Sequence, residues 1–320
     1  MEKNKQLDFE TRKMREDMRQ ERRRLQFPFL MMSPFIILTL IFVCIPIVLM
    51  ILMSFTDMGI TLEWNFIGFT NYKKIFTNPE MGKIILRTLL FVAVNVCFSL
   101  LGSIFVVVIT TYYLDLVYKR KNLGLFFRII WLLPSLTPSI VMMSIWRFVF
   151  GPQNYGLINK ILLALNLPAM NWFSDYSMQL LMFAACLGSA SGSIILFSSA
   201  IMQIPNHILQ SAKVDGASNL YICRRIVLPY LRWPIMQKTL WTILGNFTAY
   251  ESIRLLTSGG PMGSTTTYAY YIYENAYYYQ TYGYGAALSV FMVALSVCFG
   301  LIMLRVFNID KQMRAPRMDI

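Results

Sequence analysis

Residues 27–53 read FPFLMMSPFIILTLIFVCIPIVLMILM, an apolar stretch that contains no charged side chain. A helix of this length can cross about 30 Å of hydrocarbon at roughly 1.5 Å per residue. A cleavable signal peptide has a shorter apolar segment that ends in small residues, whereas this stretch continues into FTDMG. We therefore expect a first membrane-spanning helix that the protein retains.

Similar apolar stretches recur along the rest of the chain. Of its 320 residues, 56% are hydrophobic and 14% are charged, whereas a soluble domain is about 45–50% apolar and about 25% charged. This composition excludes an ordinary soluble protein and predicts a multi-pass, all-α membrane protein. Six spans are expected, and after the first they cover residues 84–114, 126–150, 177–203, 235–256 and 284–306.

Positive charge is divided unequally between the two sides that these spans define. Residues 1–26 form a basic tail, which precedes a six-helix membrane domain over residues 27–320. Of the 29 Lys and Arg, 22 fall in this tail or in segments on its side, among them Arg128 and Lys238, and five fall on the other side. Cytoplasmic segments carry the excess of Lys and Arg, so both termini are predicted to be cytoplasmic. The basic excess then reflects contact with membrane and cytoplasm, and no nucleic-acid partner is expected.

Motifs for catalysis, metals and nucleotides are missing from the sequence. The five cysteines, at 44, 97, 186, 223 and 298, show no CxxC spacing, and His207 is the single histidine, so neither a metal site nor a disulfide framework is expected. No GxxxxGK[ST], HExxH or GxSxG motif occurs. We expect no catalytic residue and no cofactor in this chain, and any ATP that drives it must bind another subunit.

One polar segment lies between the predicted fourth and fifth spans. Residues 204–236 read IPNHILQSAKVDGASNLYICRRIVLPYLRWPIM. The pattern predicts a short helix over 208–214, a turn at Asp215 and Gly216, and a second helix that restarts at Ala217, since glycine tolerates backbone angles that other residues resist. Two short helices joined at an angle would form a rigid cytoplasmic elbow, here defined as residues 204–234. On spacing alone, an ordinary loop between spans is an equal alternative.

The elbow resembles the EAA loop of ATP-binding-cassette importer permeases, whose pattern runs EAAxxDGA followed by I-x-LP. The match falls at Ala212, Asp215, Gly216, Ala217, Ile226, Leu228 and Pro229, and the chain departs from the pattern at Gln210 and Ser211. In that family the loop docks into a groove on the ATPase subunit, and glutamine in place of glutamate keeps the size but loses the charge. The resemblance implies an ATPase-coupling role for Gln210, Ser211, Ala212, Asp215, Gly216, Ala217, Leu228 and Pro229, with Ala212 and Ala217 packing closely against the ATPase.

A second block, LLTSGGPMGSTTTYAYYIYENAYYYQTYGYGAA at 255–287, resembles the LTxGGPxxxT…Y…fGyaxA segment of carbohydrate-type permeases. It fits at Leu256, Thr257, Gly259, Gly260, Pro261, Thr265, Tyr273, Gly283, Tyr284 and Ala287. Over about residues 27–310 the chain is thus similar to permease subunits of bacterial type I importers for oligosaccharides and glycerol-phosphate. The resemblance implies the type I importer fold, the cytoplasmic (inner) membrane and transport of a carbohydrate by alternating access. Its implied partners are a second permease in a heterodimer, two ATPase subunits that bind ATP and Mg, and an extracytoplasmic solute-binding protein.

Polar and aromatic residues within or beside the spans suggest a substrate path. Charge inside a membrane is costly, which draws attention to Arg147, Glu251 and Arg254. Glu251 and Arg254 lie three residues apart and could satisfy each other. Alternatively they could bind a polar ligand near the midplane, with aromatic side chains stacking on sugar faces, although tyrosines also mark membrane interfaces. The candidate path consists of Trp146, Arg147, Asn246, Tyr250, Glu251 and Arg254, with Tyr268, Tyr270, Tyr271 and Tyr273 as further stacking candidates.

Two features of the spans and two other functions remain open at this point. Pro134 and Pro138 are expected to bend the third span. The small-residue strip Gly188-Ser-Ala-Ser-Gly192 allows another helix to approach closely, in this chain or in a partner. An importer for glycerol-phosphate or an acidic saccharide would use Arg147 or Arg254 to meet the anion. An ion-coupled secondary transporter would depend on Glu251.

Overall fold

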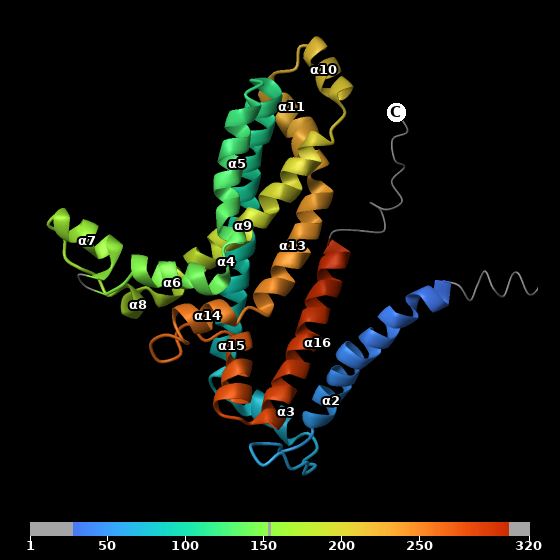
Figure 1. Ribbon diagram of the computed structural model, residues 1–320, viewed down its shortest axis with the longest axis vertical. Helices are drawn as coiled ribbons and strands as arrows, with labels where there is room; N and C mark the ends of the chain where they lie inside the picture. The colour runs from blue at the N-terminus through green and yellow to red at the C-terminus, as the bar shows by residue number, and fades with distance from the viewer. Residues whose placement is uncertain (1–27, 153–154, 307–320) are drawn as a thin grey trace, which may run out of the picture.

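The computed structural model describes residues 28–152 and 155–306, which form an elongated helical bundle (Figure 1). Between these residues the extended pairing is limited to one isolated bridge, Thr56 to Phe66. The all-α prediction is therefore confirmed for the described part of the chain. The predicted basic tail over 1–26 lies outside the described residues.

Within the described residues, four helices are long and apolar enough to cross a membrane. They correspond to the predicted spans at 27–53, 84–114, 177–203 and 284–306. The first ends in η1 (Leu40–Cys44) and α2 (Ile45–Met53), and the second joins α4 (Met81–Val107) to the π-helical segment η2 (Val108–Val117). The four run over Pro28–Met53, Met81–Val117, α9 (Ser177–Met202) and α16 (Tyr282–Val306).

The predicted third span, 126–150, is not one continuous helix. It divides into α5 (Lys121–Leu136) and α6 (Ser139–Val149), and the two axes differ by 100°. Thr137 adopts an extended conformation with ψ 128°, because a residue before proline is pushed out of the helical region. Pro138 then begins α6 without an N–H to continue the α5 hydrogen bonds. The predicted bend is confirmed at Pro138, whereas Pro134 lies within the continuous helix α5. Beyond the bend, α6 leaves the bundle sideways (Figure 1).

The predicted fifth span, 235–256, is also interrupted. Helix α13 (Arg232–Phe247) has 16 residues, about 24 Å at the usual rise and less than the hydrocarbon thickness. The chain turns over 248–250 and resumes as α14 (Glu251–Leu256). Counting the bent pair α5–α6 as one span gives at most five spans in the described chain. The count of six and the cytoplasmic position of the termini stay predictions.

Helices α4 and α9 form the centre of the bundle, with α5 and α13 packed against them. Ser99 of α4 contacts the small-residue strip of α9, with Ser99 Oγ 3.0 Å from Ser193 Oγ and 3.0 Å from the Ser189 carbonyl oxygen. At Gly192 a Cβ would lie 3.4 Å from Lys238 Nζ of α13. The contacts of this strip seen in the structure therefore lie within the chain. Lys238, which the charge count placed in a cytoplasmic segment, lies within helix α13.

Short helices connect these elements. Buried Asn159 of α7 holds the loop beyond α6, since its Nδ2 donates to the carbonyl oxygens of Gly151 and Met170, each at 3.0 Å. The remaining elements are α3 (Thr70–Thr77), α7 (Leu157–Ala164), α8 (Trp172–Asp175), α10 (Asn206–Val214), α11 (Asn219–Ile222), η4 (Cys223–Val227), α12 (Leu228–Tyr230), α15 (Tyr268–Tyr273) and η5 (Glu274–Tyr278).

The end of the bundle that carries α3 and the start of α16 depends on one close backbone contact. Asn71 Nδ2 donates to the carbonyl oxygens of Ser54 and Thr56 at 3.0 and 2.8 Å. A Cβ at Gly283 would overlap the Thr56 carbonyl oxygen. The glycine therefore lets α16 meet the segment that follows the first helix.

We expect Gly283→Ala to destabilise the protein by about 2 kcal/mol, as inserted atoms do in packed interiors. Thermal unfolding of the purified protein in detergent measures the loss. Gly300→Ala, in the same helix, is the matched control because no atom lies within 4 Å of its added Cβ. Equal melting temperatures for the two variants would contradict the contact.

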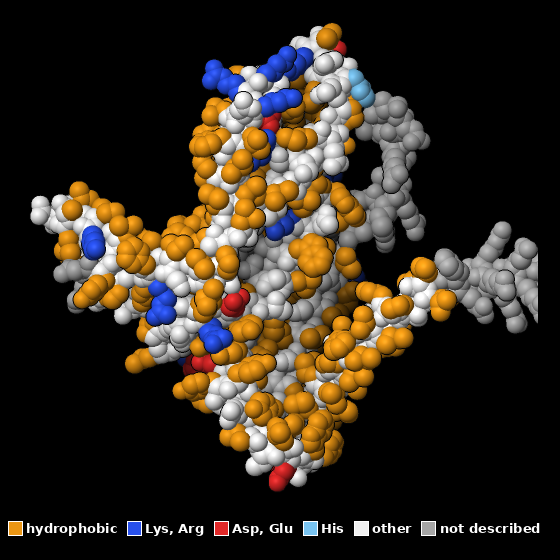
Figure 2. Space-filling view, viewed as in Figure 1, with side chains coloured by type: hydrophobic (Ala, Val, Ile, Leu, Met, Phe, Trp, Pro, Cys, Tyr) orange, Lys and Arg blue, Asp and Glu red, His pale blue; other side chains and the backbone are white. Residues whose placement is uncertain are grey.

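Apolar side chains cover much of the surface shown in Figure 2, including the length of the first helix. In its most apolar stretch no residue is buried, and it meets the bundle through α2 packed against α16. Lys and Arg side chains gather at the end of the bundle away from α3, over the region of α5, α10 and α11 (Figure 2). An apolar belt with a basic end is typical of a membrane protein whose basic end faces the cytoplasm.

Candidate functional site

The elbow has the helix–turn–helix geometry that the sequence predicts, although the second helix begins at Asn219 and not at Ala217. Helix α10 ends at Val214, Asp215 is its C-cap, and Gly216 has φ +80°. Ala217 N donates to the Ala212 carbonyl oxygen at 2.9 Å and Gly216 N to that of Lys213 at 3.1 Å. These two bonds form a Schellman motif, which satisfies the last carbonyls of a helix and requires a left-handed residue. Gly216 thus sets the angle at which the chain leaves α10.

The inner face of the elbow packs against the bundle. Leu209 is buried in one core cluster with Ile222 and Val227, and Ala212 and Ala217 pack against that cluster. Both alanines are half-buried and contact this chain's own core, and their close packing against the ATPase stays a prediction. Burial also raises the pKa of the Cys223 thiol, which makes it a poor nucleophile.

The outer face of the elbow is exposed. Of the predicted coupling residues, Gln210, Ser211, Asp215, Gly216 and Pro229 are exposed, and Leu228 is half-buried. Three large side chains that were not predicted from the sequence are also exposed on the elbow: Val214, Leu220 and Tyr221 are 87%, 69% and 57% exposed. A cavity of about 580 Å³ lies beside them, lined by Ser218, Leu220, Tyr221, Arg224 and Arg225. The sequence signal that could have identified this surface is the placement of the apolar residues Leu220 and Tyr221 just before the pair Arg224 and Arg225.

The second candidate region is the junction of α6, α14 and α15. Helix α14 packs against α6, and Met143, Ile253 and Tyr270 share a core cluster with Phe91 of α4. Trp146 of α6 packs against Phe183, with ring centroids 5.4 Å apart. Its indole nitrogen is buried and has no acceptor among the described residues. The break in each of two predicted spans therefore creates this junction.

A stack of aromatic rings runs along one side of the junction. Tyr273 lies 5.2 Å from Tyr250 and 5.5 Å from Tyr277, and the ring planes differ by 17° and 23°. The guanidinium carbon of Arg254 lies 5.1 Å from the Tyr273 ring centre, a cation–π arrangement. Tyr250 is 41% exposed. The stack therefore presents an aromatic face and a cation on the accessible side of the junction.

The ion pair between Glu251 and Arg254 is not formed. Across residues 28–152 and 155–306, the ion pairs are Lys83–Glu80 and Arg128–Asp115. Both Glu251 and Arg254 are exposed. The alternative in which these two side chains satisfy each other is thus wrong for this structure, and both remain available to a ligand.

The other sequence-predicted tyrosines serve the core. Tyr268 is 2% exposed and its hydroxyl donates to the Leu288 carbonyl oxygen at 3.1 Å. Tyr271 Oη accepts a hydrogen bond from Asn78 Nδ2 at 3.0 Å, and Tyr270 is buried. The Tyr270 ring also stacks on Tyr273, with centroids 6.0 Å apart and planes that differ by 26°. Of the four stacking candidates, Tyr270 and Tyr273 therefore belong to the stack, and Tyr270 forms its buried end.

The remaining two path candidates lie apart from the stack. Arg147 lines a cavity of about 530 Å³ together with Phe173, Leu256, Thr257, Ser258 and Pro261. Asn246 is near the end of α13, where its Nδ2 donates to the Thr242 carbonyl oxygen at 2.8 Å. The structure thus brings Trp146, Arg147, Tyr250, Glu251 and Arg254 to the junction, and it ties the amide donor of Asn246 to its own helix.

The matched part of the chain includes both the elbow and the junction. Residues 113–308 match the family described as "Binding-protein-dependent transport system inner membrane component". The chain belongs to this family. Family membership establishes a transport role, consistent with a bundle of apolar helices.

Named relatives of this family member are permeases. It is 26% identical to the sulfoquinovosyl glycerol transport system permease protein SmoG of Agrobacterium fabrum, over 87% of this chain and 89% of that protein. It is 27% identical to the arabinooligosaccharides transport system permease protein AraP of Bacillus subtilis, over 87% of both chains. It is 28% identical to the diacetylchitobiose uptake system permease protein NgcF of Streptomyces coelicolor, over 81% of this chain and 76% of that one.

Solved structures share the fold. The chain superposes with a TM-score of 0.75 on a chain of a bacterial ABC transporter that imports the acidic polysaccharide alginate. The identity is 20%, and the match covers 90% of this chain and 96% of the other. A second structure of the alginate transporter, in complex with a periplasmic protein bound to an alginate pentasaccharide, also has a TM-score of 0.75 at 21% identity, covering 89% and 94%. The fold is that of an ABC importer permease.

Proposed function

We propose that this chain is one of two permease subunits of an ATP-driven importer that takes up a carbohydrate, an oligosaccharide, by alternating access. A binding protein outside the bacterial cytoplasmic membrane delivers the substrate, and two ATPase subunits bind ATP and Mg. The observation that carries the proposal is that one packed bundle holds an exposed elbow at one end and, at a distance from it, an aromatic and charged junction.

The junction has the chemistry of a carbohydrate site. Aromatic faces stack on the C–H faces of sugar rings, and Tyr250 offers such a face. The Arg254 guanidinium donates hydrogen bonds and the Glu251 carboxylate accepts them, which suits sugar hydroxyls. The buried indole N–H of Trp146 adds a donor without an internal acceptor. The names of relatives, which transport arabinooligosaccharides, diacetylchitobiose and a sulfoquinovosyl glycerol, support the same substrate class.

The elbow has the shape of a docking element. Its inner face is fixed to the core by Leu209 and Ala212, so a force applied to its outer face moves the bundle with it. Val214, Leu220 and Tyr221 give that outer face an apolar surface next to Arg224 and Arg225. Here the ATPase would dock, and closing of the ATPase dimer around ATP would pull the elbow and open the junction to the outside.

A second permease accounts for the exposure of the first helix. Within the described residues, the main packing of that helix on its own bundle is that of α2 against α16. Its most apolar stretch has no buried residue, so most of its length is accessible to lipid and to the partner permease. We therefore assign a heterodimer of permeases, in line with the sequence resemblance.

An anionic saccharide or glycerol-phosphate is the second candidate substrate. Arg147 and Arg254 form no ion pair within the described chain, and the alginate transporter that shares the fold imports an acidic polysaccharide. Two carboxylates are sequence neighbours of the stacked rings: Glu251 directly follows Tyr250, and Glu274 directly follows Tyr273. Because the negative charges of these two carboxylates balance the positive charges of Arg147 and Arg254, we favour a neutral oligosaccharide as the substrate.

Affinity purification of the tagged chain from native membranes in mild detergent tests the assembly. We expect mass spectrometry to identify an ATPase subunit and a second permease in the purified sample. Recovery of the chain alone, under conditions in which a control importer stays assembled, would overturn the proposal and favour an ion-coupled transporter. Uptake by proteoliposomes of radiolabelled neutral and acidic oligosaccharides then separates the two substrate classes.

A further inference from the structure

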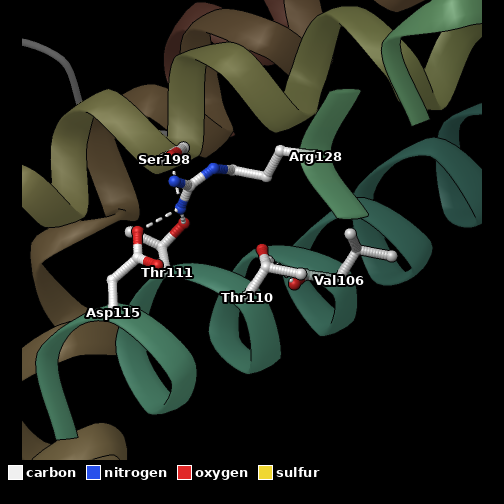
Figure 3. Close-up of polar contacts among 6 residues, drawn as sticks. All are labelled: Val106, Thr110, Thr111, Asp115, Arg128 and Ser198. Atoms are coloured by element: carbon white, nitrogen blue, oxygen red, sulfur yellow. Dashed lines mark hydrogen bonds and ion pairs between the residues drawn. The ribbon is translucent and has the colours of Figure 1, made fainter. Parts of the chain in front are cut away.

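A buried polar cluster joins three helical elements near the elbow (Figure 3). Arg128 of α5 and Asp115 of η2 form an ion pair with Nη1 2.6 Å from Oδ2, and their side chains are 10% and 4% exposed. The same Nη1 donates to Thr111 Oγ1 of η2 at 2.8 Å. Thr111 Oγ1 lies 2.9 Å from Ser198 Oγ of α9. One guanidinium thus connects η2 and α5, and through Thr111 it reaches α9.

The backbones of α5 and η2 touch beside this cluster. A Cβ at Gly124 of α5 would overlap Asp115 Oδ1 and lie 2.5 Å from the Thr110 carbonyl oxygen. No larger residue fits unless α5 moves away from η2. The ion pair and the glycine therefore hold the two elements at one separation.

Segment η2 also contacts the elbow. Tyr112 is 2% exposed, and its hydroxyl donates to the Asn219 carbonyl oxygen of α11 at 2.9 Å. Tyr112, Ile222 and Val227 share one core cluster. The π-helical form of η2 is itself common at functional positions. Adjacent residues of η2, Thr111 and Tyr112, therefore face α5 and the elbow respectively.

The other end of α5 leads to the junction. Beyond the break at Thr137 and Pro138 the chain continues as α6, which packs against α14. A series of elements thus runs from the elbow through η2, which packs against α5, and continues along the chain across the break into α6, which packs against α14. Networks of this kind can carry coupling between two sites when an element moves as a unit.

The energetics of the pair argue against stability as its purpose. Desolvation of two charges cancels much of their attraction, and apolar residues of similar volume often stabilise a protein at least as well. Asp115 Oδ1 moreover has no hydrogen-bond partner among the described residues, which is unusual for a buried carboxylate. The ion pair instead fixes the position of α5 relative to η2.

We propose that the Asp115–Arg128–Thr111 cluster transmits movement of the elbow to the junction. The proposal rests on the proposed ATPase-driven function. Asp115, Arg128 and Thr111 are positioning residues, which hold α5 to η2 so that α6 and α14 follow the elbow. Loss of this fixed position uncouples ATP hydrolysis from the opening of the junction.

The test measures how far nucleotide binding by the ATPase changes the exposure of the junction, and it requires no knowledge of the substrate. The full complex is purified with a cysteine at Ser258, an exposed residue that lines the cavity beside Arg147, in a background in which the natural cysteines are replaced by alanine. The labelling rate by a membrane-impermeant maleimide is compared with and without ATP and vanadate, together with ATPase activity. We expect the wild-type labelling rate to change at least about fivefold, in the range of typical coupling.

Gly124→Ala separates the two helices without changing any charge, and Thr111→Val removes one hydroxyl while keeping the shape of the side chain. Both variants are expected to assemble and hydrolyse ATP but to lose the nucleotide-dependent change at position 258. Gly82→Ala is the control, because nothing lies within 4 Å of its added Cβ, and it should behave as wild type.

The possible failures are distinct. If the wild-type chain brings down no ATPase, the proposed function fails and this inference fails with it. If the wild-type complex responds to nucleotide and both variants respond equally, the inference alone is overturned. If neither variant assembles, the cluster is a folding element, and the inference is overturned as well.

Discussion

Replacing Gly216 by valine is expected to lower uptake at least about tenfold while the protein still inserts into the membrane. Gly216 has φ +80°, and no atom lies within 4 Å of an added Cβ. The defect therefore arises from the backbone alone, because left-handed angles cost an ordinary residue roughly 1–2 kcal/mol and a β-branched residue more. Each 1.4 kcal/mol corresponds to about a tenfold change in population. The valine variant would hold the elbow in another shape, to which the proposed ATPase subunit would no longer dock.

Gly216→Asn is the matched control, since asparagine visits left-handed angles more readily than other residues. It should retain most of the uptake and of the bound ATPase. Both quantities are measured on proteoliposomes and on detergent-purified complexes. If the valine variant took up substrate at the wild-type rate, the elbow would have no role in the coupling mechanism.

Replacing Tyr273 by alanine is expected to reduce the maximal rate of uptake at least about tenfold. The ring supports Tyr250 on one side and lies beneath the Arg254 guanidinium. An aromatic pair contributes about 0.5–1.5 kcal/mol beyond burial and a partly desolvated cation–π contact about 1–2 kcal/mol. Without the ring, both side chains lose their fixed positions. The half-saturating substrate concentration should stay the same, since the separate binding protein captures the substrate.

Tyr273→Phe keeps the ring and should transport normally, because no hydrogen bond involves the Tyr273 hydroxyl in the described structure. Tyr278→Ala is a second control, as Tyr278 is 77% exposed and lies outside the stack. An equal loss for alanine at 273 and at 278 would indicate a general effect of tyrosine removal. Full activity of the 273 alanine variant would exclude the stack from the substrate path.

Local signals in the sequence predicted local structure well. The apolar stretches at 27–53, 177–203 and 284–306 match helices to within a few residues, because length and hydropathy alone decide them. The Asp215-Gly216 turn was predictable for a similar reason, since only glycine adopts such angles freely. The bend before α6 followed from Pro138.

The features that could not be predicted from the sequence depend on contacts between residues that are distant along the chain. Asp115 and Arg128 are 13 residues apart on different elements, and Arg128 was counted as a cytoplasmic loop charge because no periodicity marks it as buried. The break after Phe247 was missed because 235–256 is apolar on average, whereas Asn246 and Thr248 bond to their own helix at its end. The Glu251–Arg254 pair was a reasonable alternative from spacing, but Tyr273 offers Arg254 a different contact.

The exposure of the first helix also bears on the order in which the chain is made and inserted. A helix that needs no tertiary neighbour can enter the bilayer as soon as it leaves the ribosome, and it fixes the orientation of everything that follows. Helix α13 is in the opposite situation: it has 16 residues and includes Lys238, so it is too short and too polar to partition alone. Its place against α4 and α9 exists only once those helices are in the membrane. Biogenesis should therefore proceed in two stages, with independent insertion of the long helices followed by recruitment of α13 into the preformed groove.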